Sequence, residues 1–312
     1  MPAQPNLKRE FALLALLALL WGASYPLIKV AVTEIPPMTL IAVRVALAAS
    51  VLLAVVYVER ASLPRDGRTW RMLFVQALLN SVGAWTILAW GQQYIDAGLA
   101  GVLNSTSPLF VFIITLFFSQ HEPVTGWKLA GVLLGLGGVL LLFGTDVLRG
   151  LGMNVLAQGA VLLGAALYAG AAIYGRQFSH LPPSVTAAGT MMWATLTLVP
   201  LSLIVDTPWR LSPSAPAILA VAGLGIFSTA FALLLYFRLV RTIGSMGVAS
   251  QSYLRASISV VLGMVFLGES MSYTVALGLL LTIAGVAAIN TAPARRNPEI
   301  STPGENRRKE GV

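Results

Sequence analysis

Uninterrupted apolar runs of about 20 residues recur along nearly the whole chain, and they constrain its fold more than any other feature. An α-helix of that length spans about 30 Å, the thickness of the hydrocarbon core of a bilayer. In lipid only helices and closed β-barrels satisfy their own backbone, and barrel strands are shorter and alternate in polarity. We therefore predict an all-α polytopic membrane protein with ten transmembrane helices. The expected spans are residues 10–31, 36–58, 70–91, 97–119, 125–144, 153–177, 183–205, 214–240, 245–267 and 272–291.

The composition argues against several classes of soluble protein. Of the 312 residues, 57% are hydrophobic and only 10% are charged, whereas about 25% of the residues in an ordinary soluble domain are charged. Too few polar groups remain to cover a soluble enzyme, a nucleic-acid-binding module or a disordered chain. There is no cysteine, only two histidines (His121 and His180), and no GxxxxGK[ST] or HExxH motif. We expect no enzymatic activity, no cofactor and no metal site.

The first apolar run admits two interpretations. Lys8 and Arg9 precede a stretch rich in Leu and Ala, as in a secretory signal peptide. The stretch continues past Trp21 and Pro26 to Val32, which favours an uncleaved first helix instead.

The positions of the basic residues predict the orientation. With the N-terminus inside, most of the 20 Lys and Arg residues fall in inner segments, as they do in cytoplasmic loops. We therefore expect a multi-pass protein of a bacterial-type inner (plasma) membrane with both termini in the cytoplasm. The net charge of +8 then reflects the basic residues of the cytoplasmic segments and not a surface that binds nucleic acid, so we expect no nucleic-acid partner.

The two halves of the chain repeat each other. A shift of 147 residues superimposes them without a gap and places Pro36 on Pro183 and Glu122 on Glu269. Each half then holds five spans, and an odd number makes the second copy enter the membrane from the opposite side. The other matches are Ser105 with Ser252, Gly131 with Gly278, Gly138 with Gly285, and Trp21 with Tyr168. The expected units are an N-terminal five-helix repeat (1–147), an inverted C-terminal five-helix repeat (148–294) and a disordered cytoplasmic tail (295–312).

Short motifs in both halves resemble a known family. They are Trp21-Gly22-Ala23-Ser24 with Pro36, Pro108 followed by an apolar run and Glu122, Gly131-x3-Gly135-x2-Gly138, and Leu267-Gly268-Glu269 with Gly278 and Gly285. Over residues 10–291 the chain resembles the EamA family of the drug/metabolite transporter superfamily, and within it the YddG-type exporters of amino acids and metabolites. The resemblance implies ten helices in two repeats. Arg255 is the repeat mate of Pro108, so the resemblance would lead one to expect proline there. The resemblance therefore says little about the role of Arg255.

Polar residues interrupt spans four and nine at matching positions. At membrane depth such side chains face a cavity or another helix, so these segments either line a central cavity or join helices. Arg255 is the sharpest case because an arginine at mid-span costs at least about 2.5–3.5 kcal/mol. It could hold a substrate carboxylate in a bidentate pair or clamp two helices together. The candidate substrate-binding residues here are Asn104, Ser107, Gln251, Tyr253 and Arg255.

Aromatic and amide residues of other spans extend the candidate site. Their rings could stack on a flat part of a substrate or only pack between helices. The further candidates are Trp21, Tyr25, Asn80, Trp85 and Tyr168. Arg44 in span two is interpreted as structural, paired with an acidic loop residue. The expected hinge, kink or packing residues are Pro26, Pro108, Gly131, Gly135, Gly138, Gly278 and Gly285, and the glycines predict that spans five and ten meet.

These features favour an alternating-access transporter that exports small metabolites, foremost amino acids, through a central cavity between inverted repeats. The expected partners are small-molecule substrates and the lipid bilayer, and one copy of the chain suffices to form the cavity. No Asp or Glu lies at mid-span, which favours facilitated over proton-coupled transport. The alternative is a membrane-embedded enzyme or accessory protein that acts on a lipid-linked substrate.

Overall fold

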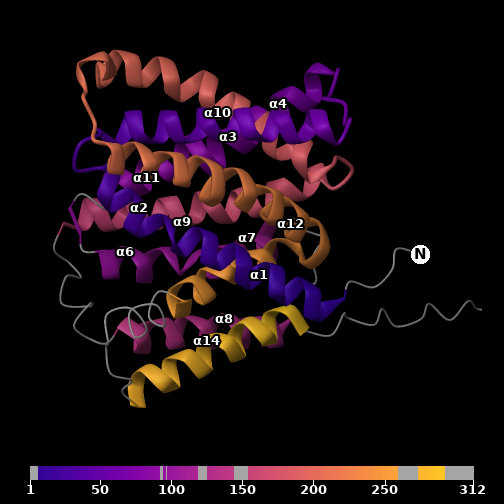
Figure 1. Cartoon of the computed structure of the whole chain (residues 1–312). Helices are drawn as coiled ribbons and strands as arrows, with labels where there is room; N and C mark the ends of the chain where they lie inside the picture. Colours follow the sequence, from indigo (N-terminus) through magenta and orange to yellow (C-terminus); the bar gives the residue numbers. More distant parts are fainter. Residues whose placement is uncertain are drawn as a thin grey trace, which may run out of the picture.

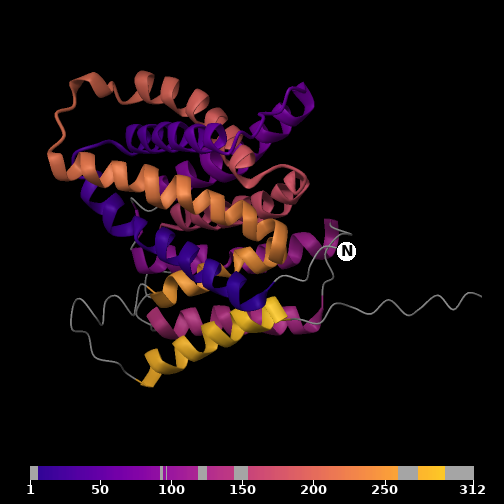
Figure 2. The same cartoon turned by 45° about the vertical axis from the view of Figure 1, so that its right-hand side comes forward.

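The computed structural model describes residues 6–91, 94–95, 97–118, 125–143, 154–258 and 273–291. Within these ranges every regular element is a helix, as the apolar runs predict. The helices run side by side in one bundle (Figure 1), and the first described helix begins at the side of the bundle where the last one ends (Figure 1, Figure 2).

The helices of the first half overlap the first five predicted spans. They are α1 (Leu7–Gly22), α2 (Ser24–Ala31), α3 (Pro37–Val58), α4 (Gly67–Ala77), the π-helix η1 (Leu78–Ala84), α5 (Trp85–Gly91), α6 (Ala97–Asn104), α7 (Ser107–Phe118) and α8 (Gly126–Phe143). Spans one and four are each divided into two helices, whereas the sequence predicted one helix for each. The physical reason is a proline in each span, Pro26 and Pro108, whose missing N–H leaves a carbonyl of the preceding turn without its helical donor.

The helices of the second half follow a similar plan. They are α9 (Val155–Gly175), the 3₁₀ turn η3 (Arg176–Phe178), α10 (Pro183–Val205), the 3₁₀ turn η4 (Pro208–Arg210), α11 (Ala215–Gly225), the π-helix η5 (Ile226–Phe231), α12 (Ala232–Ala249), a helical stretch over 251–258, and α14 (Tyr273–Thr291). Gly244 interrupts α12 with φ 80°, ψ 177°, a conformation that favours glycine. This break lies between the predicted spans 214–240 and 245–267.

Six of the described helical stretches are long and apolar enough to cross a membrane. They are Pro37–Val58, Gly67–Leu88, Val155–Phe178, Pro183–Val205, Ala215–Ala249 and Tyr273–Thr291, with shorter apolar helices over Gly101–Phe117 and Gly126–Leu142. Large aromatic side chains are exposed near helix ends, among them Tyr57, Trp127, Trp209 and Tyr273. Exposed rings at these positions are typical of the two membrane–water interfaces.

Helices α3 and α10 pack together and cap each other. The Asp206 carboxylate, at the end of α10, accepts the Thr39 backbone N–H (2.7 Å) and hydroxyl (2.8 Å) at the start of α3. At the other end, the Glu59 carboxylate accepts the hydroxyl of Ser184 at the start of α10. Glu59 and Asp206 are 147 residues apart and are therefore repeat mates. Each carboxylate accepts hydrogen bonds at the start of a helix in the other half, where backbone N–H groups lack helical partners.

Helices α8 and α14 cross through their glycines. A Cβ atom built on Gly131 would lie 2.9 Å from the Gly285 carbonyl oxygen, and one on Gly138 would lie 2.8 Å from the Gly278 carbonyl oxygen. Backbones this close require residues without side chains. The predicted meeting of spans five and ten is therefore present in the structure, and the order of the contacts shows that the two helices run in opposite directions.

The two π-helices occupy matching positions of the two halves. A shift of 147 places η1 on residues 225–231, which overlap η5. A π-helix is rare and often marks a functional position, because it widens the helix and frees backbone groups. Nothing in the apolar pattern predicted these two segments.

Candidate functional site

A small cavity lies where helices of both halves meet. Its volume is about 30 Å³, room for about two water molecules. Its walls come from α1, α6, α7, α9, α12 and the helical stretch 251–258. The lining residues are Trp21, Asn104, Ser107, Tyr168, Ala172, Tyr236, Val248, Ala249, Gln251, Ser252 and Arg255.

Three helix breaks converge on this cavity, and a hydroxyl group stabilises each break. The hydroxyls of Ser24, Thr106 and Ser250 each donate a 2.6 Å hydrogen bond to the carbonyl three residues earlier. Those bonds satisfy carbonyl groups near the points where the helices stop. Irregular backbone at membrane depth is tolerated where it lines a cavity or is buried in protein. The position of the three breaks beside the cavity fits this rule.

Six of the ten candidate binding residues line the cavity. They are Trp21, Asn104, Ser107, Tyr168, Gln251 and Arg255. Two pairs among them are repeat mates 147 residues apart, Trp21 with Tyr168 and Asn104 with Gln251. Through these pairs each half contributes one ring and one amide to the same small space. That these residues bind substrate stays a prediction.

Tyr253 does not line the cavity, contrary to its place among the candidates. Its hydroxyl donates to the Val132 carbonyl (3.1 Å) and its ring lies against Gly135 of α8. The reason is helical geometry: at 3.6 residues per turn, a residue two positions after Gln251 points to nearly the opposite side, whereas Arg255 returns to the same side. Tyr253 thus joins the 251–258 helix to α8.

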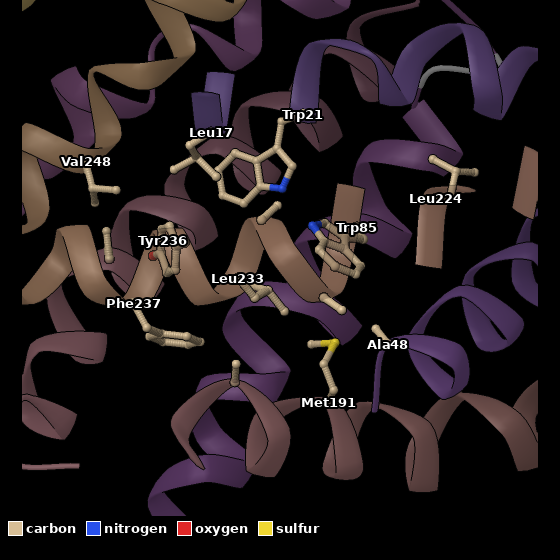
Figure 3. Packing of buried hydrophobic residues seen from close by; sticks show 14 of the residues in the cluster. Leu17, Trp21, Ala48, Trp85, Met191, Leu224, Leu233, Tyr236, Phe237 and Val248 are labelled. Atoms are coloured by element: carbon tan, nitrogen blue, oxygen red, sulfur yellow. The ribbon is translucent and has the colours of Figure 1, made fainter. Parts of the chain in front are cut away.

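Three other candidates fall elsewhere. Asn80 is buried in η1 and is not among the cavity residues, and neither of its amide atoms has a hydrogen-bond partner. Trp85 lies in the apolar core beside Leu233 and above Met191 (Figure 3). For Tyr25 only the backbone, within α2, is described.

Trp85 packs against Arg44, which is 7% exposed and was expected to pair with an acidic loop residue. The guanidinium instead lies 4.3 Å from the centre of the Trp85 ring. Its Nε donates to the Thr229 hydroxyl (2.6 Å) and its Nη2 to the Ser228 carbonyl (3.4 Å) in η5. The π-helix supplies the acceptors, so this arginine joins α3 to the second half, and none of its contacts with described residues is to a carboxylate.

A double-mutant cycle can test this arrangement. We expect Arg44→Met and Trp85→Leu to be coupled by about 0.5–2 kcal/mol, because a desolvated guanidinium over an indole face gains that much from the ring. Thermal unfolding of the parent, both single variants and the double variant in detergent measures the coupling. If the two single changes in stability add up to the change in the double variant, the ring and the guanidinium do not interact energetically.

Two residues that the sequence analysis missed adjoin the cavity helices. Tyr236 of α12 lines the cavity, and its ring centre lies 5.6 Å from that of Trp21 (Figure 3). Glu10, 3% exposed at the start of α1, forms an ion pair with Arg238 (3.1 Å) and accepts the Thr242 hydroxyl (2.8 Å). Tyr236 was hidden in a Leu-rich run and its repeat mate is Ala89, whereas Glu10 could have been noticed as an acid at the very start of a span.

Comparisons with known proteins agree with this architecture. The model of the EamA-like transporter family matches residues 9–144 and 156–291, two segments offset by the same 147 residues as the internal repeat. The chain is 28% identical to the uncharacterized transporter YvbV of Bacillus subtilis over 91% of this chain and 92% of the relative. It is 27% identical to the uncharacterized inner membrane transporter YedA of Escherichia coli over 84% of each chain. A solved crystal structure, 21% identical, superimposes with a TM-score of 0.76 over 90% of this chain and 96% of that one, which shows the same fold.

Proposed function

This chain belongs to the EamA-like transporter family, and from that premise we propose that it exports small metabolites, foremost amino acids, by alternating access. The observation that carries the proposal is the cavity whose walls hold repeat-related pairs, Trp21 with Tyr168 and Asn104 with Gln251. A site between two repeats, bordered by broken helices, is where transporters built from repeats bind substrate.

The same premise extends to topology. We propose two inverted five-helix repeats, over 1–147 and 148–294, in an inner membrane with both termini on the cytoplasmic side. The antiparallel crossing of α8 and α14 and the mutual capping of α3 and α10 support a two-fold relation between the halves. The common side of the bundle at which α1 begins and α14 ends supports the placement of both termini together (Figure 1, Figure 2). The whole of the proposed tail, 295–312, lies outside the described residues.

The chemistry of the lining favours a carboxylate-bearing substrate. Among the described lining residues only Arg255 carries a charge, and a guanidinium can receive a carboxylate through a bidentate pair. The rings and amides supply stacking and hydrogen bonds to the rest of the molecule. The cavity of about 30 Å³ is smaller than an amino acid, so it must widen to load one.

Purified protein in liposomes tests the proposal. We expect counterflow of labelled amino acids that is unchanged by a pH gradient, because the described lining residues include no carboxylic acid that could carry a proton. Empty liposomes and trapped unlabelled sugar serve as controls. The absence of counterflow with every amino acid, from protein that elutes as a folded species, would overturn the proposal.

The Glu10 ion pair offers a test of alternating access. It joins α1 to α12, both of which line the cavity, near the end of the bundle where α1 begins. We expect Glu10→Gln to let that end open more often, because hydrogen bonds to charged groups contribute about 1.5–3 kcal/mol. The chain has no cysteine, so a single cysteine introduced at the buried cavity residue Val248 reports opening by its rate of maleimide labelling. We expect labelling about three- to tenfold faster.

Asp66→Asn is the matched control for this experiment. Asp66 accepts the Thr69 N–H (2.7 Å) at the start of α4 and lies in the loop before it, so the same acid-to-amide change leaves the α1–α12 contact intact. Equal labelling rates in the Glu10 variant and the parent would contradict a gating role for the ion pair.

A further inference from the structure

Three buried polar atoms at the cavity have no hydrogen-bond partner. They are Asn104 Oδ1, Gln251 Oε1 and the Tyr236 hydroxyl, and all three residues line the cavity. The residues are only 6%, 8% and 5% exposed. Buried polar groups are nearly always hydrogen-bonded in native proteins, so three unpartnered atoms at one cavity point to a ligand that completes them.

All three atoms are oxygens that accept hydrogen bonds. Carbonyl oxygens of amide side chains only accept, and a tyrosine hydroxyl both donates and accepts. A single group that satisfies all three oxygens would therefore present several N–H or O–H donors. A primary ammonium group presents three N–H donors, and its charge is also attracted to the face of an aromatic ring such as Trp21.

We infer that the cavity binds the primary ammonium group of its substrate through Asn104, Gln251 and Tyr236, while Arg255 takes the carboxylate. This inference rests on the proposed function and narrows it to substrates with a free α-amino group. Asn104 and Gln251 are repeat mates, so the ammonium ion bridges the two halves. Selectivity for the amine then comes from neutral oxygens and rings, in a wall whose described residues include no carboxylate.

The experiment compares three unlabelled analogues as inhibitors of amino-acid counterflow in liposomes. The first is an α-amino acid that the protein transports, the second is its 2-hydroxy acid, and the third is its N,N,N-trimethyl derivative. The hydroxy acid keeps the carboxylate but has one donor, and the trimethyl derivative keeps the positive charge but has none. We expect the parent protein to prefer the amino acid at least about tenfold over both.

Variants then assign the preference to the three oxygens. We expect Asn104→Leu, Gln251→Met and Tyr236→Phe each to reduce the preference for the amino acid over the hydroxy acid about three- to tenfold, with the inhibition constant of the hydroxy acid little changed. Gln76→Met is the matched control for Gln251→Met: Gln76 is equally an internal amide with an unpartnered Oε1, but it does not line the cavity. We expect its selectivity to equal that of the parent.

Tyr236→Phe and Gln251→Met keep the size of the side chain, so these two variants preserve the packing, and elution as a folded species verifies it. Amino-acid counterflow with no preference over the hydroxy acid, or a preference that survives in all three variants, would overturn the inference and leave the proposed function standing. Failure of the proposed function looks different, because the parent protein would then transport no amino acid at all.

Discussion

Replacing Gly285 by alanine will destabilise the protein by about 3 kcal/mol, at the upper end of the cost of overpacking, because backbone atoms already surround the position of the added Cβ. That atom would lie 2.5 Å from the Gly135 backbone nitrogen and 2.6 Å from the Gly131 carbonyl oxygen. Both neighbours are backbone atoms of α8, so relief requires the two helices to separate. Separation would remove the packing through small residues on which helix association in a membrane depends.

Gly137→Ala provides the matched control in the same pair of helices. A Cβ on Gly137 of α8 meets nothing within 4 Å, and alanine favours a helix by about 1 kcal/mol over glycine. Thermal unfolding in detergent, monitored by loss of the folded peak in size exclusion, should show a marked fall in midpoint for Gly285→Ala and none for Gly137→Ala. Similar midpoints for the two variants would refute the close α8–α14 crossing.

Arg255→Ala will weaken transport of carboxylate-bearing substrates by about 10- to 100-fold. A hydrogen bond to a charged group contributes about 1.5–3 kcal/mol, and 1.4 kcal/mol corresponds to a factor of ten in binding. Arg255 lines the cavity from the 251–258 helix. The decarboxylated amine of the same substrate has nothing for the guanidinium to bind, so its transport should fall far less.

The Arg255→Lys variant tests whether the positive charge alone is sufficient or the shape of the guanidinium is also needed. Lysine keeps the positive charge but lacks the planar fork that holds a carboxylate at two points, so we expect an intermediate loss. Concentration-dependent counterflow in liposomes measures all three proteins, and their yield in the membrane verifies insertion. Unchanged counterflow of amino acids by Arg255→Ala would remove the carboxylate role.

The fold was predictable where it depends on long patterns. Apolar runs predict the helices, and glycines at a fixed spacing predict the α8–α14 crossing, because both signals extend over many residues. The π-helices η1 and η5 were not predictable, since no residue type or apolar spacing in these segments marks a π-helix. In η5 the Ser228 carbonyl accepts a hydrogen bond from Arg44, which lies 184 residues earlier in the chain.

The cavity was predictable where the internal repeat aligned polar or aromatic residues. The repeat predicts Asn104 with Gln251 and Trp21 with Tyr168 as cavity residues, and all four line the cavity in the structure. The direction in which a side chain points was harder to predict. Tyr253 lies two positions after Gln251, but it packs on α8 and does not line the cavity. Tyr236 gave no signal because it has no polar or aromatic repeat mate.

The mutual capping of α3 and α10 has a consequence for biosynthesis. The Thr39 N–H at the start of α3 receives its acceptor from Asp206, 167 residues later in the chain. At about 5–20 residues per second, a ribosome needs roughly 8–33 seconds to cover that interval. During that time the first half stands in the membrane without the carboxylate that completes α3. A truncated product that ends before Asp206 would leave the Thr39 N–H without its carboxylate acceptor.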